Sequence, residues 1–563
     1  MTRPDVSGDG SSLTKMNIAS HLTAMAGCQP SRPAVVFPHA RDQQGRVSYT
    51  HYTFRQLDEV SGRLALGFSS LGMRRGMRVA LMVPPSLDFF ALTFALFKLG
   101  AVPVLIDPGI GLPNLGKGLA EAEPEAFIGI PKAHAVRVLL GWARATLKIK
   151  VTVGARALFG GVTLNQVRDL GAVQAPLPAV EPSPNETAAI LFTSGSTGPS
   201  KGVVYTHEYF AAQVEHIRQL YGIQPGEIDL PTFPLFALFG PALGMTAIIP
   251  DMDPTRPAQV DPAKIVEAIE HFGVTNMFGS PAVIRRVGRY GEQSRLKFSS
   301  LRRVISAGAP VPAKELQRFC RLLAPGAQVF TPYGATECLP VSSIGSDEIL
   351  GETRRQTDLG RGVCVGRPVP GLSVKIIRIS DVPIPAWDKA LEAEPGEIGE
   401  IAVKGQHVTR VYFNRQEATE LAKIMDGPGG EFYHRMGDLG YLDAQGRIWF
   451  CGRKSHRVVT RQGTFFSIPC EAIFNTHPSV FRSALVGVKR GSETEPVICV
   501  ELEPEARGNL EPLTAELRDL AAKHPHTRPI QRFLVHPGFP VDIRHNAKIF
   551  REKLATWAGR KRL

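Results

Sequence analysis

An apolar strand, an apolar helix and a second apolar strand follow one another between residues 78 and 107, and this order narrows the possible folds most. RVALMVP (78–84) is continuously apolar, LDFFALTFALFKLG (87–100) has the length of a helix that ends at Gly100, and AVPVLID (101–107) is apolar again. Strands that are apolar on both faces and alternate with helices are typical of a parallel sheet covered by helices. The sequence therefore predicts an α/β fold.

Length and a change in pattern predict two domains. The chain has 563 residues, more than the ~250–300 that one hydrophobic core covers. From about residue 397, GEIGEIAVKG and GYLDAQGRIWFCGR alternate with glycine turns, as short antiparallel strands do. After Arg453 a smaller unit of mixed helices and strands follows, with candidate strands at 481–489, 496–502 and 531–537. We expect one domain over 1–452 and a second over 453–563.

Composition excludes several classes of protein. The net charge of +13 fits a solvated basic surface or anionic small substrates; nucleic acid or membrane binding is disfavoured, because the only basic run is the tail 560–562. The seven scattered cysteines include no CxxC pair, which argues against disulfides and structural zinc and favours the cytoplasm. Residues 1–15 lack the apolar core of a signal peptide and are expected to be a disordered tail.

The segment between Asp229 and Asp251 contains no charged residue and has the length of a membrane span. It also contains four prolines, at positions 231, 234, 241 and 250. A spanning helix does not carry so many breaks. We therefore predict no transmembrane segment, and instead a buried loop and strand that form part of a pocket.

A loop rich in glycine and hydroxyl side chains follows an apolar strand. The Pro-rich stretch 172–187 predicts a linker, AAILF (188–192) a strand, and TSGSTGPSKG (193–202) the loop. Loops after buried strands hold ligands in α/β folds, and backbone N–H groups with hydroxyls can surround phosphate oxygens. The spacing is not that of the P-loop, which has four residues between its glycines and then Lys-Ser/Thr. A surface turn is the alternative for this loop taken alone.

Four further segments follow the loop in order: SAGAP (306–310), TPYGATE (331–337), GDLGYLDAQGRIWFCGR (437–453) and IRHNAKIFREK (543–553). With the loop, they resemble the adenylate-forming superfamily of acyl-CoA ligases, luciferases and peptide-synthetase adenylation domains, over nearly the whole chain. The resemblance implies a large N-terminal domain of layered, parallel-rich sheets with helices plus a small distorted β-barrel. A small mobile α+β domain is expected to follow it.

The resemblance also implies an ATP site and a set of catalytic residues. ATP would contact Thr193, Ser194, Gly195, Ser196, Thr197, Gly198 and Lys201 through its phosphates, Gly308, Ala309, Pro310, Tyr333 and Gly334 near the adenine, and Asp438 and Arg453 at the ribose. Thr336 would contact phosphate, Glu337 would bind Mg²⁺, and Lys548 would drive adenylation. One carboxylate suits Mg²⁺ beside phosphate oxygens, and an ammonium offsets charge on the transferring phosphoryl group. Taken singly, Lys548 would be a surface lysine and Asp438 an Asx turn.

The chain departs from many acyl-CoA ligases at four places around the second half-reaction. Ala237 replaces a histidine, Ala547 replaces the glycine before the final lysine, and Met436 replaces a threonine. The hinge region 452–463 is one residue longer, and Ser455 stands where Asp or Lys is frequent, which leaves Lys454 as a hinge candidate.

IRHNAKIFREKLA and FPLFALFGPALGMTAIIPDMDP resemble one branch, the bacterial olefin β-lactone synthetases. This implies adenylation of a long-chain 2-alkyl-3-hydroxy acid and attack by its own 3-hydroxyl, which yields a β-lactone, AMP and pyrophosphate in long-chain olefin biosynthesis. A tethered hydroxyl needs no external nucleophile, so ATP and Mg²⁺ are expected and CoA is not. The substrate pocket is assigned to Phe236, Ala237, Phe239 and Gly240. Assembly with other enzymes of the olefin pathway is a further expectation.

Two other functions compete with lactone formation. A long-chain fatty acyl-CoA ligase or fatty acyl-AMP ligase would use the same first half-reaction. A catalytically inactive relative that binds nucleotide or partners belongs to a different class. The presence of Glu337, Asp438 and Lys548 disfavours the inactive relative, and CoA dependence of the product would separate the two ligases.

Overall fold

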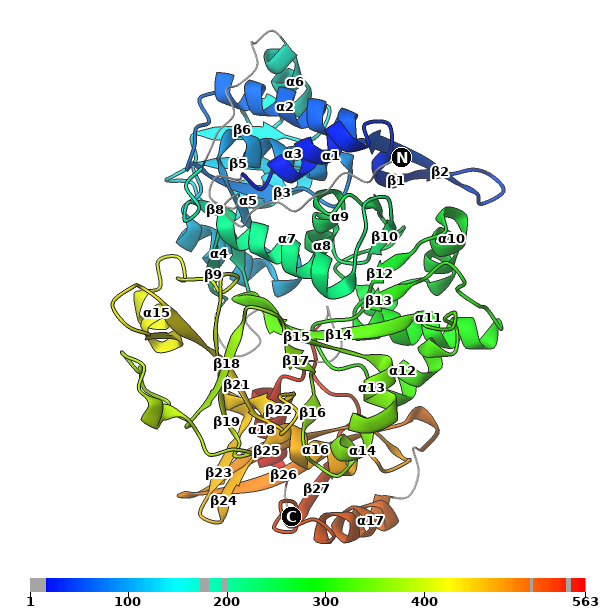
Figure 1. Cartoon of the computed structure of the whole chain (residues 1–563), viewed down its shortest axis with the longest axis vertical. Helices are drawn as coiled ribbons and strands as arrows, with labels where there is room; N and C mark the ends of the chain where they lie inside the picture. The colour runs from blue at the N-terminus through cyan, green and yellow to red at the C-terminus, as the bar shows by residue number, and fades with distance from the viewer. Residues whose placement is uncertain (1–16, 173–181, 194–199, 507–509, 543–547, 562–563) are drawn as a thin grey trace, which may run out of the picture.

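Figure 1 shows the chain as a computed structural model that describes residues 17–172, 182–193, 200–506, 510–542 and 548–561. The predicted tail 1–15, most of the predicted linker, and Ala547 lie outside the described residues. So do five predicted phosphate-loop residues: Ser194, Gly195, Ser196, Thr197 and Gly198.

The first sheet contains the apolar strand–helix–strand unit. Its order is β7-β6-β5-β3-β4-β8-β9, and all neighbours run parallel except the antiparallel pair β8 and β9. The strands are β3 (Arg78–Met82), β4 (Val102–Leu105), β5 (Ala126–Gly129), β6 (Ile149–Thr152), β7 (Val162–Thr163), β8 (Thr187–Phe192) and β9 (Gly202–Thr206). The strands predicted at 78–84, 101–107 and 188–192 are confirmed.

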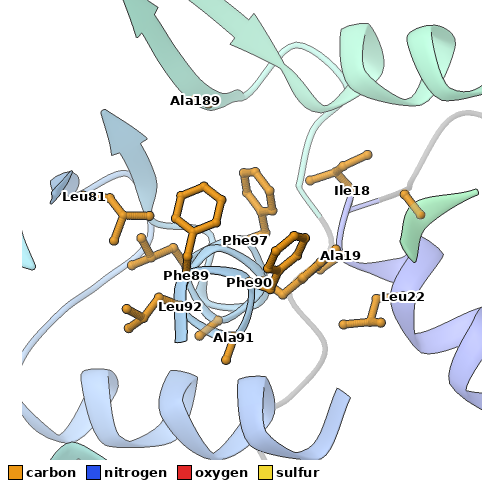
Figure 2. Close-up of a cluster of buried hydrophobic side chains, with 14 of the residues drawn as sticks. Ile18, Ala19, Leu22, Leu81, Phe89, Phe90, Ala91, Leu92, Phe97 and Ala189 are labelled. Carbon is orange, nitrogen blue, oxygen red and sulfur yellow. The ribbon is translucent and has the colours of Figure 1, made fainter. Parts of the chain in front are cut away.

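Helix α3 (Leu87–Leu99) joins β3 to β4 and is apolar on nearly all sides. Gly100 ends it in the left-handed conformation, at φ 72°, which glycine adopts without steric cost. Figure 2 shows Phe89 and Leu92 of this helix near Leu81 of β3, with Ile18 and Leu22 on the other side. A helix packed all around must be apolar all around, which explains its composition.

The second sheet has nine strands in the order β17-β15-β14-β13-β12-β10-β11-β1-β2. Its six middle strands are parallel, and β15, β17 and β2 are antiparallel additions at its edges. The strands are β1 (Pro33–Arg41), β2 (Val47–Thr53), β10 (Ile228–Pro231), β11 (Thr246–Ile248), β12 (Asn276–Phe278), β13 (Arg303–Ile305), β14 (Gln328–Ala335), β15 (Cys338–Gly345) and β17 (Arg367–Pro368).

A third sheet is antiparallel, as the glycine-punctuated sequence after residue 397 predicts. Its order is β16-β22-β21-β19-β18, with β20 on β21. It stands where the small barrel was expected. The strands are β16 (Val363–Cys364), β18 (Ser373–Ile377), β19 (Gly399–Lys404), β20 (Lys423–Met425), β21 (Phe432–Leu442) and β22 (Ile448–Arg453).

The small C-terminal domain has its own core around Phe474, Leu485 and Ile498. A two-stranded ribbon and the sheet β25-β26-β27 form it, with the last pair parallel. Its strands are β23 (Val458–Thr460), β24 (Gly463–Phe465), β25 (Val480–Arg490), β26 (Glu493–Leu502) and β27 (Arg532–Val535). The mixed α/β fold with a small C-terminal domain is as expected.

Helices cover the faces of the sheets (Figure 1). They are α1 (Ser20–Cys28), α2 (Phe54–Ser70), α4 (Leu112–Ala122), α5 (Pro131–Leu139), α6 (Leu164–Ala172), α7 (His207–Tyr221), α8 (Pro234–Ala237), α9 (Phe239–Ala242), α10 (Pro262–Phe272), α11 (Pro281–Gln293), α12 (Ala313–Cys320), α13 (Ser346–Glu348), α14 (Arg354–Asp358), α15 (Gln416–Ala422), α16 (Ser467–Phe474), α17 (Leu510–Ala522) and α18 (Arg551–Arg560). The uncharged stretch after Asp229 forms β10, the short helices α8 and α9, and β11. Among the described helices, none combines the length and apolar character that a bilayer crossing requires.

Candidate active site

The glycine-rich loop leaves the end of β8 and returns as β9. At its base, Thr193 donates its backbone N–H to the Lys201 carbonyl at 3.0 Å, and the Thr193 hydroxyl accepts from the Lys201 N–H at 3.2 Å. The hydroxyl of Ser200 donates to the Thr193 carbonyl. These bonds close the base of the loop and direct its intervening residues away from the sheet edge.

Lys201, Tyr412 and Glu337 form the first cluster beside this loop. The Lys201 ammonium lies 4.7 Å from the centre of the Tyr412 ring. The Tyr412 hydroxyl donates to Glu337 Oε1 at 2.6 Å. Burial, together with the Glu337 charge, holds the pKa of Tyr412 far above its usual range, so the phenol stays a donor. A cation and a half-buried carboxylate are thereby held on either side of one aromatic ring.

Thr336 and Glu337 lie on the turn between β14 and β15, and backbone contacts fix that turn. The Thr336 carbonyl accepts from the Tyr205 hydroxyl at 2.7 Å and from the Tyr209 hydroxyl at 3.4 Å. The Glu337 carbonyl accepts from the Thr409 N–H at 2.9 Å. With both carbonyls occupied, the side chains of Thr336 and Glu337 are free to face the site.

Tyr333, Asp438 and Arg453 form the second cluster. Asp438 and Arg453 are register partners on β21 and β22, and Arg453 Nε lies 3.1 Å from Asp438 Oδ1. The Tyr333 hydroxyl donates to Asp438 Oδ2 at 2.7 Å. The Asp438 side chain is 3% exposed, and burial raises the pKa of its carboxyl while Arg453 lowers it. Oδ1 accepts no aligned hydrogen bond from any described residue.

Lys548 belongs to the small domain but lies at this second cluster. Its positive charge is close enough to lower the pKa of the Asp438 carboxyl. Its backbone N–H donates to Asp542 Oδ1 at 2.9 Å, and its carbonyl accepts from the Asp542 N–H at 3.0 Å. The structure therefore brings together the final lysine and the Asp438–Arg453 pair, which are about 100 residues apart in sequence.

Gly308, Ala309 and Pro310 follow β13 at the same sheet edge. Gly308 has φ 97°, a conformation that favours glycine. Gly334 lies in β14, and a Cβ there would come within 2.5 Å of the Cys338 carbonyl oxygen. Both glycines are thus required by the backbone, whatever they bind.

An apolar cavity opens beside these clusters and has about 590 Å³ of space, including its mouth. Its size falls within the ~300–1,000 Å³ of small-molecule sites. Ala307 and Pro332 line one side, and Phe236 and Phe239 another. Ala237 and Gly240 were assigned to the pocket with these two phenylalanines, but both are buried in packing and do not line the cavity walls.

The two hinge candidates lie in a single 3₁₀ turn, Lys454–His456. Lys454 Nζ donates to the Ser380 carbonyl at 2.7 Å and lies 3.2 Å from the Glu400 carboxylate. Glu400 also pairs with Arg435 at 2.7 Å, and both side chains are 1% exposed. Lys454 is therefore tied to the antiparallel sheet, whereas Ser455 is exposed.

Tyr412, Tyr205 and Tyr209 are site residues that the sequence did not reveal. None lies in a segment with an unusual pattern, and Tyr412 is 75 residues from the carboxylate it contacts. Their roles depend on contacts between distant segments. Among the described residues there is no cluster of three or more metal-ligating side chains, so Glu337 is a single carboxylate, as Mg²⁺ beside phosphate oxygens requires.

The chain matches the family described as AMP-binding enzyme over residues 22–413. Fold and site together define an adenylate-forming ligase. More specifically, the chain belongs to the AMP-binding enzyme family.

Two relatives are similar along nearly their whole length. The chain is 50% identical to the olefin beta-lactone synthetase of Xanthomonas campestris pv. campestris, covering 99% of this chain and 100% of that protein. It is 49% identical to the olefin beta-lactone synthetase of Stenotrophomonas maltophilia, covering 96% and 98%. Among solved structures, the amide bond synthetase McbA from Marinactinospora thermotolerans has a TM-score of 0.77 at 21% identity, covering 96% and 99%. That likeness concerns the fold alone.

Proposed function

We propose that this protein uses ATP to adenylate a long-chain 2-alkyl-3-hydroxy acid and closes it to a β-lactone, releasing pyrophosphate and AMP. The observation that carries the proposal is the 50% identity, over 99% of the chain, to a protein named olefin beta-lactone synthetase. The two residue clusters at the mouth of an apolar cavity support it, because they supply cations and a carboxylate where two anions must meet.

In the proposed first step, a substrate carboxylate oxygen attacks the α-phosphorus of ATP, and the bond to pyrophosphate breaks. Lys201 and the loop after Thr193 would hold the β- and γ-phosphates, and Thr336 would contact phosphate. The Lys548 ammonium would offset charge that builds up on the α-phosphoryl oxygens. Mg²⁺, when bound, neutralises charge on the phosphates, and Glu337 would hold it.

The nucleoside would lie against the second cluster. Asp438 Oδ1 is buried and accepts no aligned hydrogen bond within the described residues, so it is available to a ribose hydroxyl. Arg453 and the Tyr333 hydroxyl hold the carboxylate in place. Gly308, Ala309, Pro310 and Gly334 would form the adenine wall, because side chains are small or absent there.

In the proposed second step, the 3-hydroxyl oxygen attacks the adenylated carbonyl carbon. The new C–O bond closes a four-membered ring, the C–O bond to AMP breaks, and the hydroxyl proton is lost to a base. The nucleophile is tethered beside the carbonyl, so no thiol has to enter. The anchoring of Lys454 to Glu400 supports a small domain that needs no rearrangement between the steps, and CoA is not part of the proposal.

The boundary between the domains is proposed to fall at 452/453, where β22 ends and the 3₁₀ turn of Lys454 begins. A cytoplasmic location is proposed because all seven cysteines are free thiols. Assembly with enzymes that supply the hydroxy acid or consume the lactone remains part of the olefin-pathway proposal.

The test is product analysis with and without CoA. Purified protein is incubated with ATP, Mg²⁺ and a racemic 2-alkyl-3-hydroxy acid, and the organic products are identified by NMR and mass spectrometry. We expect a β-lactone and one AMP per turnover in both reactions. A thioester product, or strict dependence on CoA, would show an acyl-CoA ligase instead. Acyl-AMP that accumulates without ring closure would show an acyl-AMP ligase.

A further inference from the structure

Two polar side chains interrupt the wall of the apolar cavity. Asp229 of β10 and Asn276 of β12 both line it, while the surrounding wall is formed by residues such as Phe278 and Met245. Asp229 is 4% exposed and Asn276 3% exposed. Asn276 Nδ2 donates to Asp229 Oδ1 at 2.5 Å. A carboxyl and an amide in a hydrocarbon-lined space need a reason, because burial of polar groups is costly.

The strand geometry places this pair at the inner end of the cavity. Asp229 and Asn276 are register partners on neighbouring parallel strands. Asn276 is also level with Arg303, two residues before β13 ends at Ile305, so the pair lies roughly 7 Å below the carboxyl edge of the sheet. Ala307, which follows that edge, lines the same cavity. The pair is therefore remote from the adenylation clusters.

Alternation along the strands shows that the pair faces the cavity. Leu230 and Met277, the next residues on each strand, belong to the other hydrophobic core on the opposite face of the sheet. Successive side chains on a strand point to opposite faces. Asp229 and Asn276 therefore share the cavity face with Phe278, which stacks on Phe236 at 4.3 Å between ring centres.

Structural ion pairing does not account for the pair. The nearby Arg303 guanidinium already binds both oxygens of Glu227, and this ion pair is buried below Asp229. Burial raises the pKa of Asp229 to about 7 despite Arg303, so the carboxyl has no strong counter-ion. Asn276 Oδ1 is buried and has no hydrogen-bond partner within the described part of the chain. One acceptor is thus left open at the cavity wall.

We propose that Asp229 and Asn276 form an O–H binding site that ends the alkyl-binding region of the cavity. The inference rests on the proposed function in taking the cavity to hold an acyl chain. The O–H group is either a water beyond the end of the chain or a hydroxyl on the chain itself, since both donate to Asn276 Oδ1 and pair with the Asp229 carboxyl. A methyl end pushed against the pair would displace the O–H group and leave both polar groups unpaired.

The first experiment uses the wild-type protein. Pyrophosphate release is measured with 2-alkyl-3-hydroxy acids of increasing chain length, each made with a methyl end or a hydroxyl end. We expect kcat/KM to reach a maximum and then fall about tenfold or more on adding one methylene. A hydroxyl end that restores turnover at the failing length identifies the chain hydroxyl as the ligand. A maximum without that rescue identifies a bound water.

The second experiment replaces the polar pair. In Asp229→Leu/Asn276→Leu the fall beyond the maximum should disappear, together with any preference for the hydroxyl end. Met277→Leu is the matched control, since Met277 lies beside Asn276 but faces the opposite core, and it should keep the wild-type length profile. The conservative Asp229→Asn retains hydrogen bonding and should keep the maximum at the same length.

A wild-type profile with neither a length maximum nor a hydroxyl preference would overturn the proposal, even if the double variant failed to fold. A folded double variant that keeps the wild-type profile would do the same. Pyrophosphate release reports only adenylation, so an enzyme that proved to make acyl-CoA would refute lactone formation without altering the outcome for this site.

Discussion

The Asp438–Arg453 pair gives the sharpest test of the proposed nucleotide site. Asp438→Asn keeps the shape of the side chain and can still accept from the Tyr333 hydroxyl, but it loses the ion pair that spans 3.1 Å to Arg453 Nε. It also replaces the charged acceptor proposed for the ribose with a neutral one. A hydrogen bond to a charged group contributes about 1.5–3 kcal/mol. At 1.4 kcal/mol per tenfold, the Kd for ATP should rise about 10–150-fold.

Isothermal titration calorimetry with ATP and Mg²⁺ measures this Kd, and thermal unfolding checks that the variant is folded. Tyr333→Phe is the matched control, because it removes one neutral donor and leaves the carboxylate and its ion pair. That loss contributes about 0.5–1.5 kcal/mol, so its Kd should rise roughly 2–12-fold. Unchanged ATP affinity in a folded Asp438→Asn variant, or an effect no larger than that of Tyr333→Phe, would refute the role of the charge.

Three more outcomes are expected. Lys548→Ala should slow pyrophosphate release about 10²–10³-fold with ATP affinity nearly unchanged; wild-type release in a rapid-quench assay would exclude its role. Glu337→Gln should raise the Mg²⁺ concentration for half-maximal turnover, and an unshifted titration would count against metal binding there. Burial raises the folded pKa of Asp229 to about 7 from 3.8, so its contribution to stability falls as the pH rises between about 4 and 7. Asp229→Asn should therefore gain in unfolding temperature over wild type at pH 8, by up to 1.4 kcal/mol per unit of pKa shift, and not at pH 4; calorimetry that finds equal gains would contradict this.

Much of the fold could be predicted from local pattern. The apolar run around α3, the helix after Pro312 and the strands predicted at 481–489, 496–502 and 531–537 all appear as helices or strands. Each is long or regular enough for its periodicity to determine its type. The uncharged stretch after Asp229 was also predicted to be buried, since its prolines exclude a spanning helix.

The site was predictable only where its residues lie in recognisable segments. Thr193, Glu337, Asp438 and Lys548 were chosen from such segments. Ala237 was assigned to the pocket wall, and its orientation could not be read from a short helix of four residues. No periodicity distinguishes two faces over so short an element.

The sequence by itself determined the order of strands and helices, the buried character of 230–250 and the residue types needed to handle ATP. These properties depend on neighbours in the chain, through hydrophobic periodicity, proline and glycine. Tertiary structure decided that Tyr412 meets Glu337, that Lys548 reaches Asp438, and that Asp229 and Asn276 share one cavity wall. Each of these pairs joins segments 47 or more residues apart, and only the pairing of strands and the packing of the two domains bring such segments into contact.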